Sequence, residues 1–87
     1  MKIKYDFSVR EIAGDFVLVP LGEAALQLSG MITTNEVGAF LIKKLQTETT
    51  KEKLLQSVCE TFETELETAR CDIENFLAQL QELDLLE

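Results

Sequence analysis

The sequence predicts a small α+β domain, winged-helix-like, in which a three-stranded antiparallel sheet is followed by three helices. Glycines at positions 14, 22 and 30 divide the first third of the chain at a spacing of eight, and the segments between them are rich in residues that favour strands. After Gly30 the apolar residues recur at helical spacing instead. Because the chain has 87 residues, it forms a single domain, residues 1–87, around one small core.

The three strands are predicted from the turns that separate them. Val9–Ala13 and Phe16–Val19 are joined by Gly14-Asp15, which supplies the backbone angles of a tight hairpin turn. Pro20 has no amide to donate, so the second strand ends there. The third strand is predicted at Ala24–Leu28, because apolar residues alternate in it before Ser29-Gly30.

Each of the three helices is predicted to begin at a capping sequence. Asn35 is the favoured cap of the first helix, with a capping box at Thr33 as the alternative, and boxes at Thr49 and Thr64 precede the second and third. The third helix is the longest, and its apolar stripe is wide enough either for a deep core or for a groove along one edge. The apolar residues of the three helices are, in order, Val37, Phe40, Leu41 and Leu45; Leu54, Leu55, Val58, Cys59 and Phe62; and Leu66, Ala69, Ile73, Phe76, Leu77, Leu80 and Leu83.

The charge of the chain argues against nucleic acid and membrane partners. The net charge is −8, and all of it lies in residues 47–87, which carry eleven acidic and three basic side chains. Such a surface repels phosphate backbones, so no nucleic acid is expected as a ligand. No apolar run approaches the ~18 residues of a membrane span, and residues 1–6 lack the apolar centre of a signal peptide. We therefore expect a cytoplasmic protein that does not bind membranes.

The composition also excludes most catalytic chemistry. The sequence contains no His, and its cysteines, Cys59 and Cys71, are twelve positions apart. Imidazole triads, two-His zinc sites and paired CxxC sites are therefore impossible. Neither a Walker A motif nor GxGxxG occurs. We expect no catalytic residues, no metal and no cofactor, with Cys59 in the core and Cys71 pointing away from the apolar stripe.

Four blocks of sequence together resemble the PqqD family in their order, spacing and total length. They are Arg10 to Pro20, Gly22, Asn35 to Phe40, and Asp72 to Leu77. The resemblance implies a RiPP precursor recognition element, a non-catalytic peptide chaperone with a winged-helix fold. Such proteins bind the leader segment of a ribosomally made precursor peptide and present it to a modifying enzyme, which is a radical SAM protein in pyrroloquinoline quinone (PQQ) biosynthesis and in many related pathways.

The resemblance also implies where the leader peptide binds. In the family, the leader adds a strand to the sheet in a groove between the third strand and the third helix. Carried onto this sequence, the peptide-binding residues are Ala24, Ala25, Leu26, Gln27, Leu28 and Ser29 on the strand side, and Arg70, Asp72, Ile73, Phe76, Leu77 and Leu80 on the helix side. An edge strand without charge or proline suits this role. The chain departs from the family at Asp84, where a helix-ending Gly is usual.

Two other classes of protein fit the composition less well. An acidic carrier protein needs a Ser at a helix start, usually after Asp, and none of Ser8, Ser29 and Ser57 follows Asp. A winged-helix DNA-binding regulator would depend on the cluster Lys43, Lys44, Lys51 and Lys53. A mass shift from a phosphopantetheine arm would indicate the carrier, and salt-dependent retention on DNA would indicate the regulator.

Overall fold

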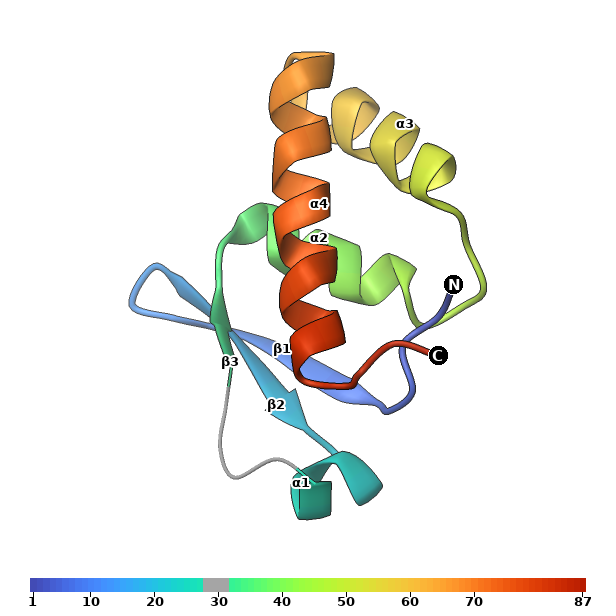
Figure 1. Cartoon of the computed structure of the whole chain (residues 1–87). Coiled ribbons are helices and arrows are strands. Elements are labelled where there is room, and N and C mark those ends of the chain that lie inside the picture. Colours follow the sequence, from blue (N-terminus) through green and yellow to red (C-terminus); the bar gives the residue numbers. More distant parts are fainter. Residues whose placement is uncertain (28–31) are drawn as a thin grey trace.

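The computed structural model describes residues 1–27 and 32–87, and it confirms the predicted fold class. A three-stranded antiparallel sheet, ordered β1-β2-β3, is followed by three helices, and one short helix precedes the third strand (Figure 1). The elements are β1 (Phe7–Ile12), β2 (Asp15–Pro20), α1 (Glu23–Gln27), β3 (Ile32–Thr34), α2 (Glu36–Lys44), α3 (Lys51–Phe62) and α4 (Leu66–Glu82).

The hairpin of β1 and β2 turns one residue earlier than predicted. Ile12 pairs with Asp15, so the two-residue turn is Ala13-Gly14 and not Gly14-Asp15. Both turn residues have positive φ, 51° at Ala13 and 87° at Gly14, as a type I′ hairpin turn requires. The prediction that β2 ends at Pro20 is confirmed.

The prediction of a third strand at Ala24–Leu28 is wrong. Glu23–Gln27 forms the one-turn helix α1, and the third strand of the sheet is Ile32–Thr34. Ala, Leu and Gln are strong helix formers, whereas Ile and Thr are β-branched and favour strands. Leu28, the last residue of the predicted strand, and Ser29, which follows it, lie outside the described residues.

The middle strand, β2, has β1 on one side and β3 on the other. The backbone N–H of Leu21, just beyond β2, donates to Asp6 O at 3.0 Å. The direction of the backbone N–H and C=O groups alternates along a strand, so Val17, four residues before Leu21, also directs these groups toward β1. Phe16 and Leu18 direct theirs toward β3. The partners of Phe16 and Leu18 on β3 are Thr34 and Ile32.

This alternation leaves one described residue of β3 whose backbone N–H and C=O groups point away from β2. Thr34 and Ile32 direct their backbone N–H and C=O groups toward β2, so Thr33 between them directs its own away from the sheet. The edge of β3 is therefore available to an additional strand at Thr33. The side chain of Thr33 lies on the opposite face of the sheet from those of Ile32 and Thr34.

The caps of α2 and α3 are Asn35 and Thr50. Asn35 is the N-cap that the sequence favoured, and its side chain accepts a hydrogen bond from the Gly38 N–H at 2.8 Å. In α3 the cap is Thr50, one residue after the predicted box start at Thr49, and its hydroxyl accepts from the Lys53 N–H at 3.2 Å. The predicted box at Thr64 is wrong, because Glu65 occupies the N-cap of α4 without a side-chain cap bond.

The core lies between the sheet and the three long helices. Helix α4 packs on α2 and α3, and α2 packs on β2 and β3 (Figure 1). Cys71 is exposed, as predicted, whereas Cys59, predicted in the core, is only partly buried and packs against the core from its margin. The largest fully buried side chains are Leu18, Leu41, Ile42, Leu45, Leu54, Val58, Ile73, Leu80 and Leu85.

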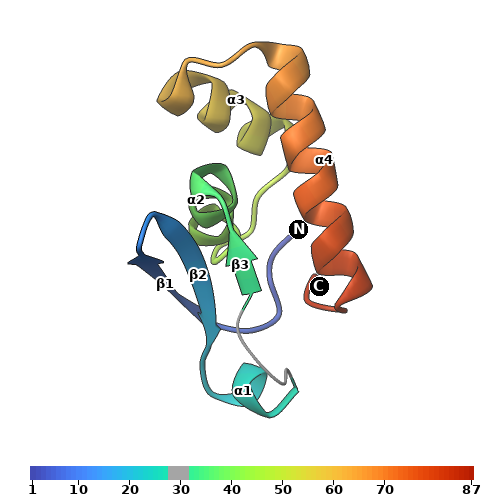
Figure 2. The same cartoon turned by 90° about the vertical axis from the view of Figure 1, so that its left-hand side faces the viewer.

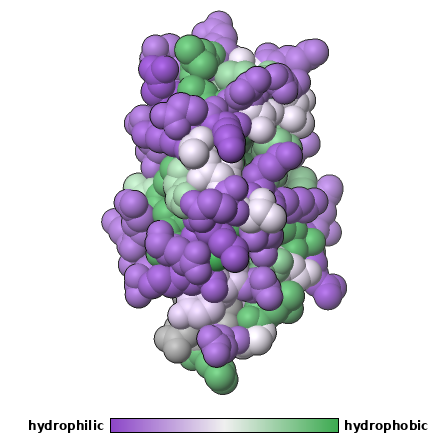
Figure 3. All heavy atoms as spheres, turned by 90° about the vertical axis from the view of Figure 1, so that its right-hand side faces the viewer, coloured by the Kyte–Doolittle hydropathy of each residue, from purple (hydrophilic) through white to green (hydrophobic). Residues whose placement is uncertain are grey.

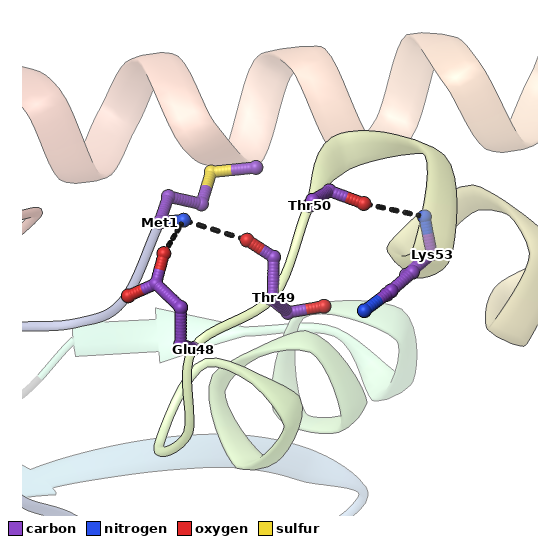
Figure 4. A network of polar contacts seen from close by, with 5 residues as sticks. All are labelled: Met1, Glu48, Thr49, Thr50 and Lys53. Carbon is purple, nitrogen blue, oxygen red and sulfur yellow. Dashed lines mark hydrogen bonds and ion pairs between the residues drawn. The ribbon is translucent and has the colours of Figure 1, made fainter.

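The first residues of the chain lie between its last residues and the α2–α3 loop. The backbone N–H of Lys4 donates to Leu85 O at 2.7 Å, and that of Thr49 donates to Met1 O at 2.9 Å. The Met1 amino group also donates to Thr49 O at 2.6 Å and pairs with the Glu48 carboxylate (Figure 4). These bonds hold both ends of the described chain against the helices.

Helix α4 ends in a Schellman motif built around Asp84. Asp84 has φ 57°, the left-handed conformation that Gly usually supplies. Its N–H donates to Gln81 O at 3.0 Å, and the Leu85 N–H donates to Leu80 O at 2.9 Å. The Asp84 carboxylate lies 2.9 Å from Lys4 Nζ, and this hydrogen bond raises the pKa of Lys4 above its ordinary value. The Gly expected from the family is thus replaced by an aspartate in the same conformation.

We expect Asp84→Gly to be more stable than Asp84→Ala by about 1 kcal/mol, since Cβ is disfavoured at positive φ. Both variants lose the exposed contact with Lys4 equally, so their difference isolates the backbone effect. In thermal unfolding, 1 kcal/mol corresponds to ~4–8 °C for a domain of this size. Equal melting temperatures would mean that residue 84 does not adopt the left-handed conformation.

Candidate functional site

A hollow of about 220 Å³ lies between the end of β3, the start of α2 and one face of α4. Figure 2 looks at the side of the molecule where β3 and α4 lie next to each other. The lining residues are Thr34 and Asn35 from the end of β3 and the cap of α2; Val37, Gly38 and Leu41 from α2; and Asp72, Asn75, Phe76 and Gln79 from α4. The hollow is therefore adjacent to the open edge of the sheet.

The α4 wall of the hollow follows helical geometry. Asp72, Asn75, Phe76 and Gln79 are spaced i, i+3, i+4 and i+7, which places them on one face of the helix. Asn75 and Gln79 are exposed, Asp72 is half-buried and Phe76 is buried. This wall combines one aromatic ring with three polar side chains that are able to contact a ligand.

The base of the hollow depends on a glycine. A Cβ at Gly38 would collide with the side chain of Thr34 and would lie 3.2 Å from the Phe76 ring. Gly38 therefore lets α2 approach both β3 and α4. The Phe76 side chain is only 7% exposed, so its ring serves the core and the hollow together.

Of the six residues predicted on the helix side, two line this hollow, Asp72 and Phe76. Arg70 and Ile73 line a separate hollow between α3 and α4. Leu77 and Leu80 are buried in the core. The apolar arc of α4 thus serves two purposes: one edge faces the hollow and its centre faces the core.

The residues predicted on the strand side do not lie on a strand. Ala24, Ala25, Leu26 and Gln27 form α1, whose backbone groups are not arranged for pairing with an added strand. Leu28 and Ser29 fall outside the described residues. In the structure the strand side of the hollow is provided by the end of β3, at Thr34, and the outward-facing Thr33 is the residue before it.

Sequence reasoning missed seven residues that line the hollow: Thr34, Asn35, Val37, Gly38, Leu41, Asn75 and Gln79. The helical spacing that starts at Asp72 would have identified Asn75 and Gln79. The contribution of α2 had no comparable signal, because it depends on how α2 packs against α4.

Among residues 1–27 and 32–87, Asp72 is the one charged residue that lines the hollow, and no ion pair involves it. Nearby cations on the α3 side have acidic neighbours of their own. Lys51 Nζ lies 3.1 Å from the Glu74 carboxylate, and Arg70 lies 3.7 Å from that of Glu67. The hollow therefore presents a negative charge among amide and apolar groups.

Two other hollows, of about 220 Å³ between α3 and α4 and of about 300 Å³ beside Phe40 and Phe62, contain no residue of β3 and do not adjoin the open edge of the sheet. The face opposite to that of Figure 2 is mostly hydrophilic, with hydrophobic residues in scattered groups (Figure 3). Among residues 1–27 and 32–87 no cluster of potential metal ligands occurs. None of the helices in this part of the chain combines the length and the hydrophobicity needed to cross a membrane. The hollow beside β3 is thus the best candidate for a binding site.

An open-edged three-stranded sheet beside a helix-lined hollow defines a winged-helix-like domain with space for one more strand. The sequence profile of the PqqD family, coenzyme PQQ synthesis protein D, matches residues 15–86. The chain therefore belongs to the PqqD family. No curated protein sequence matches it.

A solved structure has the same fold. It is described as TbiB1 in complex with the TbiA(beta) leader peptide, and the two chains superpose with a TM-score of 0.69 at 23% sequence identity. The match covers 100% of this chain and 95% of TbiB1. At this identity the similarity establishes the shared fold.

Proposed function

We propose that this protein binds the leader segment of a ribosomally made precursor peptide and presents it to a peptide-modifying enzyme. The leader adds a fourth strand to the sheet along β3. The observation that carries the proposal is the position of the outward-facing edge of Thr33 directly beside the hollow lined by α4.

The two parts of this site have complementary roles in peptide recognition. In strand addition, hydrogen bonds to the main chain supply affinity, whereas pockets for alternate side chains supply specificity. Thr33 offers a backbone donor and acceptor, and the hollow offers polar and apolar contacts to leader side chains that project to the same face of the sheet as Thr34. An edge strand as short as Ile32–Thr34 needs the contacts with α4 in addition.

Membership of the PqqD family and the fold shared with TbiB1, which was solved with a leader peptide, support leader binding. We propose that the protein is not itself an enzyme, in keeping with a sequence that has no His and no nucleophile–base pair. The modifying enzyme is proposed to be a radical SAM protein, as the family resemblance implies.

A matched pair of tryptophan variants tests the binding site. Gln79 lines the hollow, whereas Gln81 is exposed on the opposite side of α4, ~200° away. We expect Gln79→Trp to obstruct the hollow and lower leader affinity about tenfold or more, and Gln81→Trp to leave affinity unchanged. The measurement is fluorescence anisotropy with labelled leader segments of precursor peptides encoded in the same gene neighbourhood, with circular dichroism to confirm folding.

Equal affinity of the two variants would place the binding site elsewhere on the molecule. Failure of every leader to bind, together with salt-dependent binding of duplex DNA, would contradict leader recognition and would favour the DNA-binding regulator.

A further inference from the structure

We infer that the leader carries a lysine or arginine that binds Asp72, and that an apolar residue lies two positions from it. This inference rests on the proposed function and names the peptide class that the site selects. The argument uses the geometry of strand addition, the charge of the hollow and its apolar wall.

The geometry of the sheet determines which leader side chains reach the hollow. Residues directly opposite each other on neighbouring strands project to the same face. A leader residue opposite Thr33 therefore points away from the face on which Ile32 and Thr34 lie. The leader residues on either side of it, opposite Ile32 and Thr34, project to that face. They are two positions apart in the leader sequence.

The leader residue opposite Thr34 lies nearest the hollow, because Thr34 is part of its lining. The carboxylate of Asp72 lines the same hollow and accepts hydrogen bonds only. A lysine or arginine supplies donors and the opposite charge, and a hydrogen bond between charged groups is roughly twice as strong as one between neutral groups. A leader carboxylate there would be repelled.

The N-terminus of helix α2 also lines the hollow, but its backbone N–H groups do not neutralise Asp72 in place of a leader cation. Asn35 caps α2, and its side-chain oxygen accepts the Gly38 N–H at 2.8 Å. The Gly38 amide is therefore already bonded and does not face Asp72 as a free donor. The described ion pairs of α4 involve Glu67 and Glu74 but not Asp72.

The second leader position lies against an apolar surface. Ile32, on the same face of β3, is only partly buried against the core. The side chain of an apolar leader residue opposite Ile32 would cover it, and the burial of apolar area there favours binding. The site thus selects an apolar and a basic residue separated by one residue.

A displayed library of random twelve-residue peptides tests this inference. The library is selected on the whole protein, and only clones that lose binding to Thr33→Pro are kept, because those clones use the edge of β3. We expect Lys or Arg to be enriched in them, two positions from an apolar residue. Replacing this Lys or Arg with Met should weaken binding to the native protein about tenfold, and should have no effect on binding to Asp72→Asn.

Glu74→Gln is the matched control, since it removes the same charge from α4 on the side that faces α3. Enrichment of basic residues should persist on Glu74→Gln and disappear on Asp72→Asn. If no clone depends on Thr33, strand addition itself is overturned. If clones depend on Thr33 but show no basic enrichment, or keep it on Asp72→Asn, only the role of Asp72 is overturned.

Discussion

Replacing Thr33 with proline is expected to weaken leader binding strongly while leaving the domain folded. Proline removes the one described backbone N–H of β3 that faces away from the sheet, and its ring obstructs an approaching strand. A loss of ~2 kcal/mol, about thirtyfold in affinity, is expected from the missing hydrogen bond and the obstruction together.

The fold should tolerate this substitution because of the direction in which Thr33 faces. Its N–H does not donate to β2, so the pairing of Ile32 with Leu18 and of Thr34 with Phe16 is retained. Thr33→Val keeps the amide and the β-branched shape, and should bind the leader normally. Normal binding by Thr33→Pro, measured by anisotropy on a protein with unchanged circular dichroism, would exclude strand addition at β3.

Phe76→Ala is expected to destabilise the domain by ~3–5 kcal/mol, because it removes a buried ring from the core. The ring is 7% exposed and lies against α2 at Gly38. This loss is large beside a typical total stability of ~5–15 kcal/mol. The measurement is urea unfolding followed by circular dichroism, and a loss below ~1 kcal/mol would mean that the ring does not belong to the core.

Because Phe76 belongs to both the core and the hollow, its role in binding has to be tested with a variant that destabilises the core less. Phe76→Leu keeps most of the apolar contact, so it should fold with a smaller loss of stability. It should still weaken leader binding, since the hollow loses its aromatic surface. Phe76→Leu with unchanged affinity would confine Phe76 to the core.

The sequence predicted the hairpin and the three long helices because their signals are local. Gly14 forms the hairpin turn, Pro20 ends β2 and Asn35 caps α2, and each acts on the residues next to it in the sequence. The third strand was misplaced because alternation of apolar residues in Ala24–Leu28 was preferred over the composition of the segment. Helix propensity favoured α1 there, and the β-branched Ile32-Thr33-Thr34 signalled the strand.

The candidate site was predictable only on its helix side. Helical spacing placed Asp72 and Phe76 on one edge of α4, and both line the hollow. The family resemblance implied a groove beside the third strand, and because the third strand was misplaced, the strand side of this groove was predicted at Ala24–Ser29. The contribution of Gly38 arises from the close approach of α2 to β3 and α4, which no local pattern specifies.

Hydrogen exchange of the Thr33 amide tests strand addition most directly. In the free protein this N–H faces solvent at the edge of β3. When the leader is added at saturating concentration, we expect hydrogen exchange of the Thr33 amide to slow. We also expect cross-strand nuclear Overhauser effects to appear between Thr33 and the leader. A leader that binds and protects other amides, while the exchange of Thr33 stays the same, would contradict the proposed mode of binding.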